Sequence, residues 1–303
     1  MLHTTGPVPE EMLLGQFIPL HYHYNMLQDR ARMDPFRKAI DWAVPAGGSV
    51  LELGGGTGVL SYFAAQKAAK VWCVERNPAL ARAARGFLAQ NPHGDRVTVV
   101  QADAMTYVPP EPVDVVICEM LHVAMIREKQ LEVLRAFKHN YRQAFGPRLP
   151  AFIPDASLLA VQLMEQNYDF GGYHAPVPIF RPPGPHAGSR YLSDPQIYST
   201  ISYVADIPLE FQWSEYATIQ RDGTLTALSF LTKNFLVFQL TEGQTVDWMM
   251  NQLILPLANP LKVCAGDEVR IEFAYRAGCP LESLQESLTV ERKTSASPLR
   301  RAA

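Results

Sequence analysis

Residues 49–58 read SVLELGGGTG, and residues 71–77 read VWCVERN. The first stretch is a short apolar run that enters a glycine-rich turn. Glycine lets a chain turn sharply and bring backbone N–H groups close to a ligand. The second stretch is another apolar run, and it leads to an acidic residue, Glu75. A strand, a glycine turn, a helix and a strand that ends in a carboxylate together open a nucleotide-binding βαβ unit.

The composition is that of a globular protein long enough for one large domain or two ordinary ones. Of its 303 residues, 48% are hydrophobic and 19% are charged, and the net charge of -3 gives no sign of a nucleic-acid-binding surface. No apolar run is long enough to span a membrane. The N-terminal stretch MLHTTGPVPEEM lacks the basic start and apolar core of a signal peptide. We therefore expect a cytoplasmic protein that binds neither membranes nor nucleic acid, with reduced cysteines.

Strands and helices alternate over the first half of the chain. Apolar runs predict strands at 50–53, 70–75, 96–101 and 113–119, and helical patterns predict helices at 58–67, 78–90 and 127–144. This alternation is typical of a parallel sheet with helices on both faces. Upstream, residues 1 to about 12 read as a loose arm, and the pattern from residue 12 to residue 43 is helical.

The second half of the chain has the character of an antiparallel barrel or sandwich. Short β-rich runs, separated by turn signals such as Asp222-Gly223, occupy residues 157–163, 199–204, 225–240, 250–256 and 268–275. Residues 168–196 form a Pro/Gly-rich insert, either an ordered functional loop or a mobile one. We therefore predict an α/β fold in four parts: an arm with cofactor-covering helices at 1–44, a Rossmann-like domain at 45–153, an antiparallel β-barrel-like domain at 154–292 and a flexible tail at 293–303.

The glycine spacing narrows the type of ligand. Gly54, Gly56 and Gly58 follow the pattern GxGxG, whereas a dinucleotide fold favours GxGxxG. With Glu52 two residues before the first glycine, the pattern resembles motif I of class I S-adenosylmethionine (SAM)-dependent methyltransferases. SAM carries no phosphate, so its site needs carboxylates for a cation and for ribose hydroxyls. A Rossmann dehydrogenase, with Glu75 on the ribose of NAD, is the alternative.

That resemblance implies roles for residues after the second and third strands. Glu75 would accept hydrogen bonds from the two ribose hydroxyls of SAM. Asp103, together with Ala104, would lie near the adenine edge. The product of the cofactor would be S-adenosylhomocysteine (SAH).

Residues 23–32 read HYNMLQDRAR and resemble the cofactor helix HxxMLxDxxR of the protein arginine N-methyltransferases. By that similarity His23 and Met26 would approach the cofactor, and Arg32 would hold its methionyl carboxylate. Asp29 would support the active site. His21 and His23 could instead suggest a metal, but no third or fourth ligand is evident, so we expect none.

Residues 118–128 read CEMLHVAMIRE and resemble the hairpin in which the same family places two glutamates nine positions apart. The resemblance implies that Glu119 and Glu128 clamp a substrate guanidinium. A guanidinium is planar with five donors, so two carboxylates can bind it through paired, charge-assisted hydrogen bonds. Both glutamates could instead be surface carboxylates at a helix start. His122 is either a base in the site or a solvent-facing residue of the hairpin.

The acceptor half departs from the family pattern. The family's Thr-His-Trp loop corresponds to Trp248-Met249-Met250, which lacks the histidine and reads more simply as barrel core. Residues 13–17, LLGQF, stand where the family has a tyrosine pair, and the Pro/Gly-rich insert replaces its helical dimerisation arm. The acceptor is therefore expected to be a protein arginine or a small guanidine or amine. A homodimer, usual in that family, stays open. A natural-product N-, O- or C-methyltransferase, with residues 168–196 as a lid or pocket wall, and a catalytically silent SAM-binding protein are further alternatives.

Overall fold

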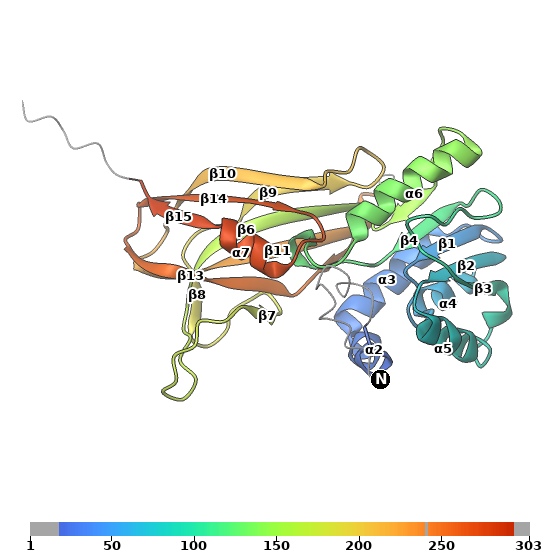
Figure 1. Cartoon of the computed structure of the whole chain (residues 1–303), viewed down its shortest axis with the longest axis horizontal. Helices are drawn as coiled ribbons and strands as arrows, with labels where there is room; N and C mark the ends of the chain where they lie inside the picture. The colour runs from blue at the N-terminus through green and yellow to red at the C-terminus, as the bar shows by residue number, and fades with distance from the viewer. Residues whose placement is uncertain (1–17, 240–241, 294–303) are drawn as a thin grey trace, which may run out of the picture.

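The glycine turn lies at one edge of a parallel sheet in the right-hand half of Figure 1. The sheet has five strands in the order β3-β2-β1-β4-β5: β1 (Ser49–Leu53), β2 (Lys70–Glu75), β3 (Val97–Gln101), β4 (Val115–Cys118) and β5 (Ala151–Ile153). Every neighbouring pair is parallel, so all carboxyl ends meet at one edge. The strand order reverses beside β1, and in such sheets the crevice at that point is where ligands bind.

The computed structural model describes residues 18–239 and 242–293. The expected loose arm at residues 1–12, the stretch 13–17 and all but the first residue of the expected tail therefore lie outside the described residues. No described helix is long and apolar enough to cross a membrane.

The helices of this half begin where the sequence supplies a turn or a cap. Gly58, at a φ of 80°, precedes α4 (Val59–Ala65) in a left-handed conformation that glycine adopts at little cost. Asn77 caps α5 (Pro78–Leu88), because its side chain accepts hydrogen bonds from the first backbone N–H groups of that helix. Both helices pack on β2, and α6 (Gln130–Phe145) connects β4 to β5.

The helical pattern expected from residue 12 to residue 43 divides into two helices over its described part. Asp29 ends α2 (Leu20–Gln28) and caps α3 (Arg30–Ala43), because its carboxylate accepts a hydrogen bond from the backbone N–H of Arg32. Helix α3 contacts both α4 and the strands β11 (Gly223–Gln239) and β12 (Gln244–Met249) of the other half. It therefore connects the two halves beside the glycine turn (Figure 1).

The β-rich half is antiparallel, as expected, and it forms two sheets. The larger sheet has seven strands. Besides β11 and β12 it contains β6 (Ala156–Gln166), β7 (Ile179–Arg181), β8 (Ser189–Tyr191), β9 (Gln196–Ser202) and β13 (Gln252–Val263). The smaller sheet has the order β10-β14-β15, with β10 (Glu210–Thr218), β14 (Glu268–Arg276) and β15 (Thr289–Arg292). Helix α7 (Leu281–Ser287) packs on β14. The larger sheet curls into a half-barrel, on the left of Figure 1.

An aromatic cluster fills the space between these two sheets. Tyr198 packs edge-on against Phe230 and Phe273, with ring centroids 6.3 and 5.0 Å away. The hydroxyls of Tyr198 and Tyr275 lie 2.8 Å apart, and the Tyr275 hydroxyl donates to the backbone carbonyl of Ala124 over 2.8 Å. Aromatic pairs of this geometry contribute about 0.5–1.5 kcal/mol each beyond their buried area. The cluster therefore also holds the segment after β4 that carries the candidate acceptor residues.

Candidate active site

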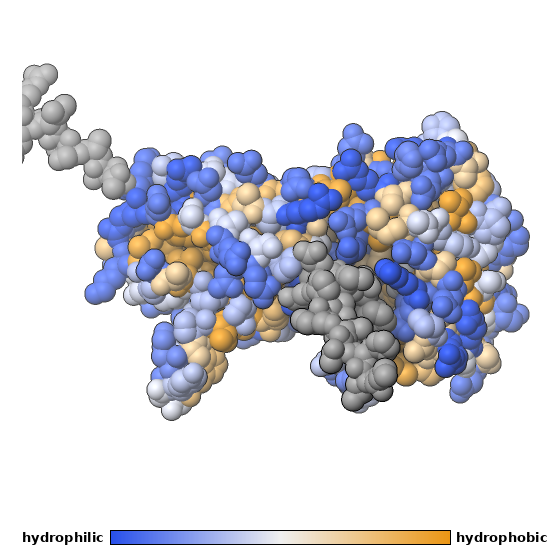
Figure 2. Space-filling view, in the orientation of Figure 1, coloured by the Kyte–Doolittle hydropathy of each residue, from blue (hydrophilic) through white to orange (hydrophobic). Residues whose placement is uncertain are grey.

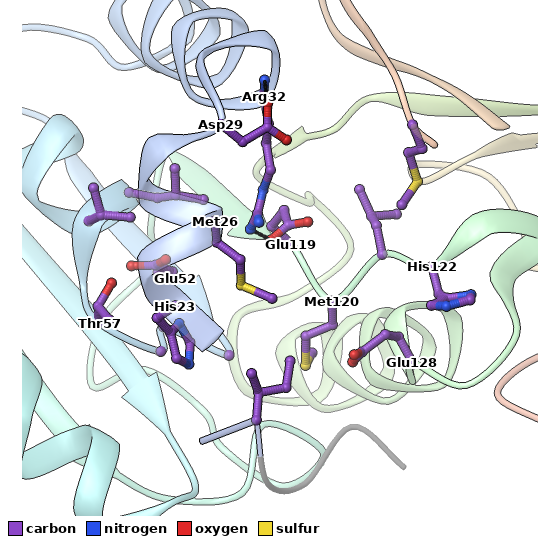
Figure 3. Close-up of a pocket in the computed structure, with 18 of the residues that line it drawn as sticks. His23, Met26, Asp29, Arg32, Glu52, Thr57, Glu119, Met120, His122 and Glu128 are labelled. Atoms are coloured by element: carbon purple, nitrogen blue, oxygen red, sulfur yellow. Dashed lines mark hydrogen bonds and ion pairs between the residues drawn. The ribbon is translucent and has the colours of Figure 1, made fainter. Parts of the chain in front are cut away.

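A cavity of about 680 Å³ lies at the carboxyl edge of the parallel sheet, between the two halves of the molecule. Its volume is in the range of small-molecule and cofactor sites. The cavity brings together, from six segments, all but one of the expected site residues: His23, Met26, Asp29, Arg32, Glu52, Gly54, Gly56, Glu75, Asp103, Ala104, Glu119, His122 and Glu128. Gly58 is the exception, and its role is to begin α4. Figure 3 shows how several of these side chains converge.

The glycine turn is shaped by contacts as well as by backbone angles. Gly54 and Gly56 have φ values of 76° and 54°, which favour glycine. Gly55 has an ordinary φ, but a Cβ there would lie 2.2 Å from the Sγ of Cys73. The motif pattern does not single out Gly55, because the reason for glycine at this position is the neighbouring strand. The close packing keeps the turn against β2 and leaves its backbone facing the cavity.

Glu75 is held by two backbone groups. One of its carboxylate oxygens accepts from the N–H of Gly56 over 2.8 Å, and the other accepts from the N–H of Asn77 over 2.7 Å. A carboxylate oxygen can accept more than one hydrogen bond, so each oxygen keeps capacity for another donor. The carboxylate is thus fixed at the floor of the cavity with two acceptor positions side by side, which suits a vicinal diol.

Glu52 is buried and bonded within the protein. Its carboxylate accepts from the backbone N–H of Ser61 over 2.9 Å and from the Ser61 hydroxyl. Burial raises the pKa of Glu52 to about 7, and the two bonds from Ser61 offset only part of that shift. Glu52 therefore ties β1 to α4 beneath the glycine turn, in addition to lining the cavity.

His23 presents an unused hydrogen-bonding atom to the cavity. Its ring lies against the glycine turn, with Cε1 3.0 Å from where a Cβ on Gly56 would be. The Nε2 atom is buried and has no partner among the described residues. Burial is also the main cause that lowers the pKa of His23, and Glu75 opposes it. A buried polar atom without a partner is rare in folded proteins, so a ligand in the cavity is its natural partner.

Asp103 lines the cavity from the loop after β3. One oxygen of its carboxylate accepts from the backbone N–H of Met105 over 2.9 Å, and the other lies 3.6 Å from Arg76. Ala104 is buried beside it. These contacts fix the loop after β3, which the family resemblance places near the adenine.

Arg32 and Glu119 form an ion pair in the middle of the cavity (Figure 3). Their side chains are only 16% and 11% exposed. Burial raises the pKa of Glu119 to about 7, and the opposite charge of Arg32 offsets only part of that shift. The guanidinium carbon of Arg32 also lies 5.9 Å from the ring centroid of Trp248. Trp248 is mostly buried against Phe36, so it is both barrel core, as expected, and cavity wall.

Glu128 and His122 line the same side of the cavity as Glu119 (Figure 3). Burial raises the pKa of Glu128, and Arg127 and Arg32 oppose it. Burial lowers the pKa of His122 to about 4, so its ring is neutral near pH 7. The Nδ1 atom of His122 lies 3.2 Å from the carbonyl of Val123. A carbonyl only accepts, so Nδ1 carries the proton and Nε2 is an acceptor.

Gln130 holds the backbone on both sides of Glu119. Its side-chain oxygen accepts from the N–H of Met120 over 2.9 Å, and its side-chain nitrogen donates to the carbonyl of Cys118 over 2.8 Å. The residue is 1% exposed. The sequence carries no sign of this role, because both partners are backbone groups that any residue has.

The insert at residues 168–196 also reaches the site and forms part of the cavity wall. Its strand β7 pairs with β13, and Phe180, Pro182 and Pro183 line the cavity. The ring of Phe180 packs edge-on against His122 at a centroid distance of 5.4 Å. Among the described residues there is no group of three side chains that could hold a metal ion.

Comparisons with known proteins agree with this arrangement. A family model described as "Methyltransferase domain" matches residues 50–143. An uncharacterized protein of Methanothermobacter thermautotrophicus is 31% identical over 272 residues, which are 88% of this chain and 97% of that protein. An arginine N(omega)-methyltransferase of Streptomyces achromogenes subsp. streptozoticus is 31% identical over 135 residues, which are 43% of this chain and 37% of that enzyme.

A solved structure has the same fold over nearly the whole chain. The Trypanosoma brucei PRMT1 enzyme-prozyme heterotetrameric complex with AdoHcy matches with a TM-score of 0.67 at 18% identity. The match covers 90% of this chain and 98% of that chain. The expected combination of a Rossmann-like sheet and a curled antiparallel sheet is thereby confirmed.

Proposed function

This chain belongs to the class I SAM-dependent methyltransferases, and we propose that it methylates a guanidinium or amine nitrogen held between Glu119 and Glu128. SAM is its cofactor, and when bound it supplies a methyl group on a positively charged sulfur. The similarity to an arginine N(omega)-methyltransferase supports an acceptor of this class. That similarity covers less than half of either chain, so the acceptor is part of the proposal.

The residues around the glycine turn fit the cofactor. Glu75 has two acceptor positions for ribose hydroxyls, and His23 has a buried ring nitrogen without a partner among the described residues. Asp103 with Ala104 would border the adenine, and Met26 would cover the cofactor from α2. Arg32 lines the cavity as a buried cation, and it would hold the methionyl carboxylate.

The observation that carries the acceptor assignment is the pair formed by Glu119 and Arg32. In this pair Glu119 already binds a guanidinium, within a buried part of the cavity and beside a second glutamate, Glu128. A cationic acceptor would therefore find two carboxylates whose pKa values are raised by burial. Binding a cation offsets the cost of ionising them there.

The two glutamates would bind, orient and deprotonate the acceptor. Holding two of its nitrogens draws positive charge toward them and leaves the third free to attack the methyl group in line with the breaking carbon–sulfur bond. The new carbon–nitrogen bond leaves the nitrogen with one proton too many. One of the two glutamates would accept that proton as a general base.

Methyl transfer from labelled SAM tests this proposal. We expect label on nitrogen of guanidines or amines. Glu119→Gln and Glu128→Gln should each lower kcat/KM for the acceptor at least about a hundredfold, which corresponds to roughly 2.7 kcal/mol, while the Kd for SAH stays within about threefold. Glu132→Gln is the matched control, because Glu132 is a carboxylate four residues further along that does not line the cavity.

Two outcomes would contradict the proposal. Label on an oxygen or carbon nucleophile, with nitrogen acceptors untouched, would exclude the guanidinium clamp. Full activity in both glutamine variants would show that the acceptor is held elsewhere.

A further inference from the structure

One wall of the acceptor side of the cavity comes from the insert. Phe180, Pro182 and Pro183 line the cavity together with Glu119, Glu128 and His122. The rings of Phe180 and His122 meet edge to face, with an interplanar angle of 77°. The insert therefore contacts the hairpin of the two glutamates directly, and it limits the space beside them.

The wall is anchored by several bonds. Strand β7 pairs with β13 through Ile179, Phe180 and Arg181. The guanidinium of Arg181 donates to the side-chain oxygens of Gln166 and Ser189, each over 2.8 Å. The carbonyl of Pro182 lies 2.8 Å from Nε2 of His186. The Arg181 bonds join β7 to β6 and β8, and the Pro182–His186 contact lies within the loop between β7 and β8, so the wall is tied to the larger sheet.

The surroundings of the two glutamates on this side are apolar. Phe180 and the two prolines offer no charge, and Trp248 and Met250 also line the cavity. His122 is neutral near pH 7, because burial lowers its pKa. Glu119 and Glu128 are thus the carboxylates beside this apolar wall, and Asp29, Lys129 and Asn251 are other polar side chains that line the cavity.

The insert is also a poor surface for a polypeptide. An arginine within a chain brings backbone in two directions, and its N–H and C=O groups need partners if they lose contact with water. Strand β7 is an edge strand, yet Pro176, Pro178, Pro182 and Pro183 surround it. Proline has no backbone N–H, and prolines at an edge discourage the addition of another strand.

We propose that the acceptor is a small free guanidine or amine rather than an arginine within a polypeptide, and that Phe180 sets this preference. The inference rests on the proposed function of Glu119 and Glu128 and specifies its substrate class. A small acceptor would place its cationic end between the glutamates and its apolar part against Phe180 and Pro182. A polypeptide would have to displace this wall.

A competition between two matched acceptors tests the proposal. N-butylguanidine carries the cationic end of an arginine side chain alone, and an acetylated, amidated Gly₄-Arg-Gly₄ peptide carries the same group within a chain. With the full-length protein and labelled SAM, we expect kcat/KM to be at least about tenfold higher for N-butylguanidine, which corresponds to about 1.4 kcal/mol. Phe180→Ala should raise kcat/KM for the peptide. The ratio of kcat/KM for N-butylguanidine to kcat/KM for the peptide should therefore fall at least about threefold.

Phe170→Ala is the matched control, because Phe170 belongs to the same insert, is 56% exposed and does not line the cavity. This variant should leave the ratio unchanged. A rise in melting temperature with SAH shows that each variant is folded. If Phe180→Ala is not folded, Phe180→Leu takes its place in the test.

The outcomes separate the two proposals. If the wild-type protein uses the peptide as well as or better than N-butylguanidine, the small-acceptor inference is overturned and the glutamate clamp stands. If the ratio is the same in Phe180→Ala, Phe180 does not set the preference. If neither acceptor is methylated, nor any other guanidine or amine, while SAH still raises the melting temperature, the proposed function itself fails.

Discussion

Glu119 combines burial with a charge that its proposed role requires. Its side chain is 11% exposed, and burial raises its pKa to about 7 even with Arg32 beside it. Glu128 adds a second negative charge, which acts in the same direction. In the free protein this carboxylate is paired with Arg32, and its burial comes at a cost in folding stability.

The pH dependence of activity should follow this residue. The guanidinium acceptor is cationic over the whole accessible range, so binding requires the ionised form of Glu119. We expect kcat/KM for the acceptor to be low below pH 6 and to rise with an apparent pKa near 7. A pH profile with N-butylguanidine measures it. A profile that is flat between pH 5.5 and 8 would contradict the role of Glu119, and the residual activity of Glu119→Gln should show no such rise.

The stability of the protein should change in the opposite direction over the same window. The folded pKa of Glu119 lies above its ordinary value of 4.5, so the folded state binds the proton more tightly than the unfolded state does. The contribution of this group to stability is therefore greatest below pH 4.5 and is lost as the pH rises through 7. Activity and stability make opposing demands on this residue.

At the scale of the element, the segment from β4 to α6 is the part of the molecule that positions the acceptor residues. Gln130 holds it from α6, and the backbone N–H of Ala124 donates to the hydroxyl of Thr232 over 2.9 Å. Ala124 and Met125 have φ values of 58° and 56°, a conformation that costs energy for residues other than glycine. The surrounding contacts from the barrel are what keep it in this shape.

Gln130→Met should separate acceptor use from cofactor binding. Methionine has a similar volume but cannot make either bond, so the backbone on both sides of Glu119 loses its support. We expect kcat/KM for the acceptor to fall at least about tenfold, or 1.4 kcal/mol, while the Kd for SAH stays within about threefold. The stability should fall by about 1–3 kcal/mol, since buried backbone groups lose their partners.

Gln162→Met is the control for that experiment. Gln162 makes one bond from its side chain to the carbonyl of Ser193, over 2.7 Å, and lies outside the cavity. Gln162→Met should lower the stability of the protein. It should not lower kcat/KM for the acceptor relative to the affinity for SAH. Equal losses of acceptor use and SAH affinity in Gln130→Met would mean that Gln130 supports only the fold.

At the scale of the whole molecule, the cofactor side and the acceptor side of the cavity come from different halves. The parallel sheet supplies the glycine turn and the glutamates, and the barrel half supplies Trp248 and the insert wall. Most of the buried apolar residues of both halves form one continuous core. The cavity therefore exists only when both halves are folded together, and a ligand in it stabilises the whole chain.

A thermal shift with cofactors tests this coupling. SAH should raise the melting temperature in a concentration-dependent way, since a ligand present at a hundred times its Kd adds about 2.7 kcal/mol to the stability of the state that binds it. NAD should have no effect. Glu75→Gln should weaken the response to SAH, and Glu111→Gln, a surface carboxylate paired with Lys70, should not. An equal or larger response to NAD would contradict the SAM site.

Much of the fold could be predicted because the strands of the parallel sheet have an easily recognised sequence pattern. The buried strands of the parallel sheet are continuous apolar runs, and the range 70–75 matches β2 at both ends. Strands β10 and β12 were missed because both have exposed faces with interspersed polar residues, which resemble loops. The separation of α2 from α3 was missed because a single cap, Asp29, interrupts an otherwise helical pattern.

The sequence by itself determined the class of the protein. The glycine turn, Glu75 and the spacing of Glu119 and Glu128 are local features, because short stretches of backbone fix where those side chains point. Tertiary structure alone decided what surrounds them. Gln130, Phe180 and the pairing of Arg32 with Glu119 depend on contacts between segments far apart in the chain, and local patterns carry no record of such contacts.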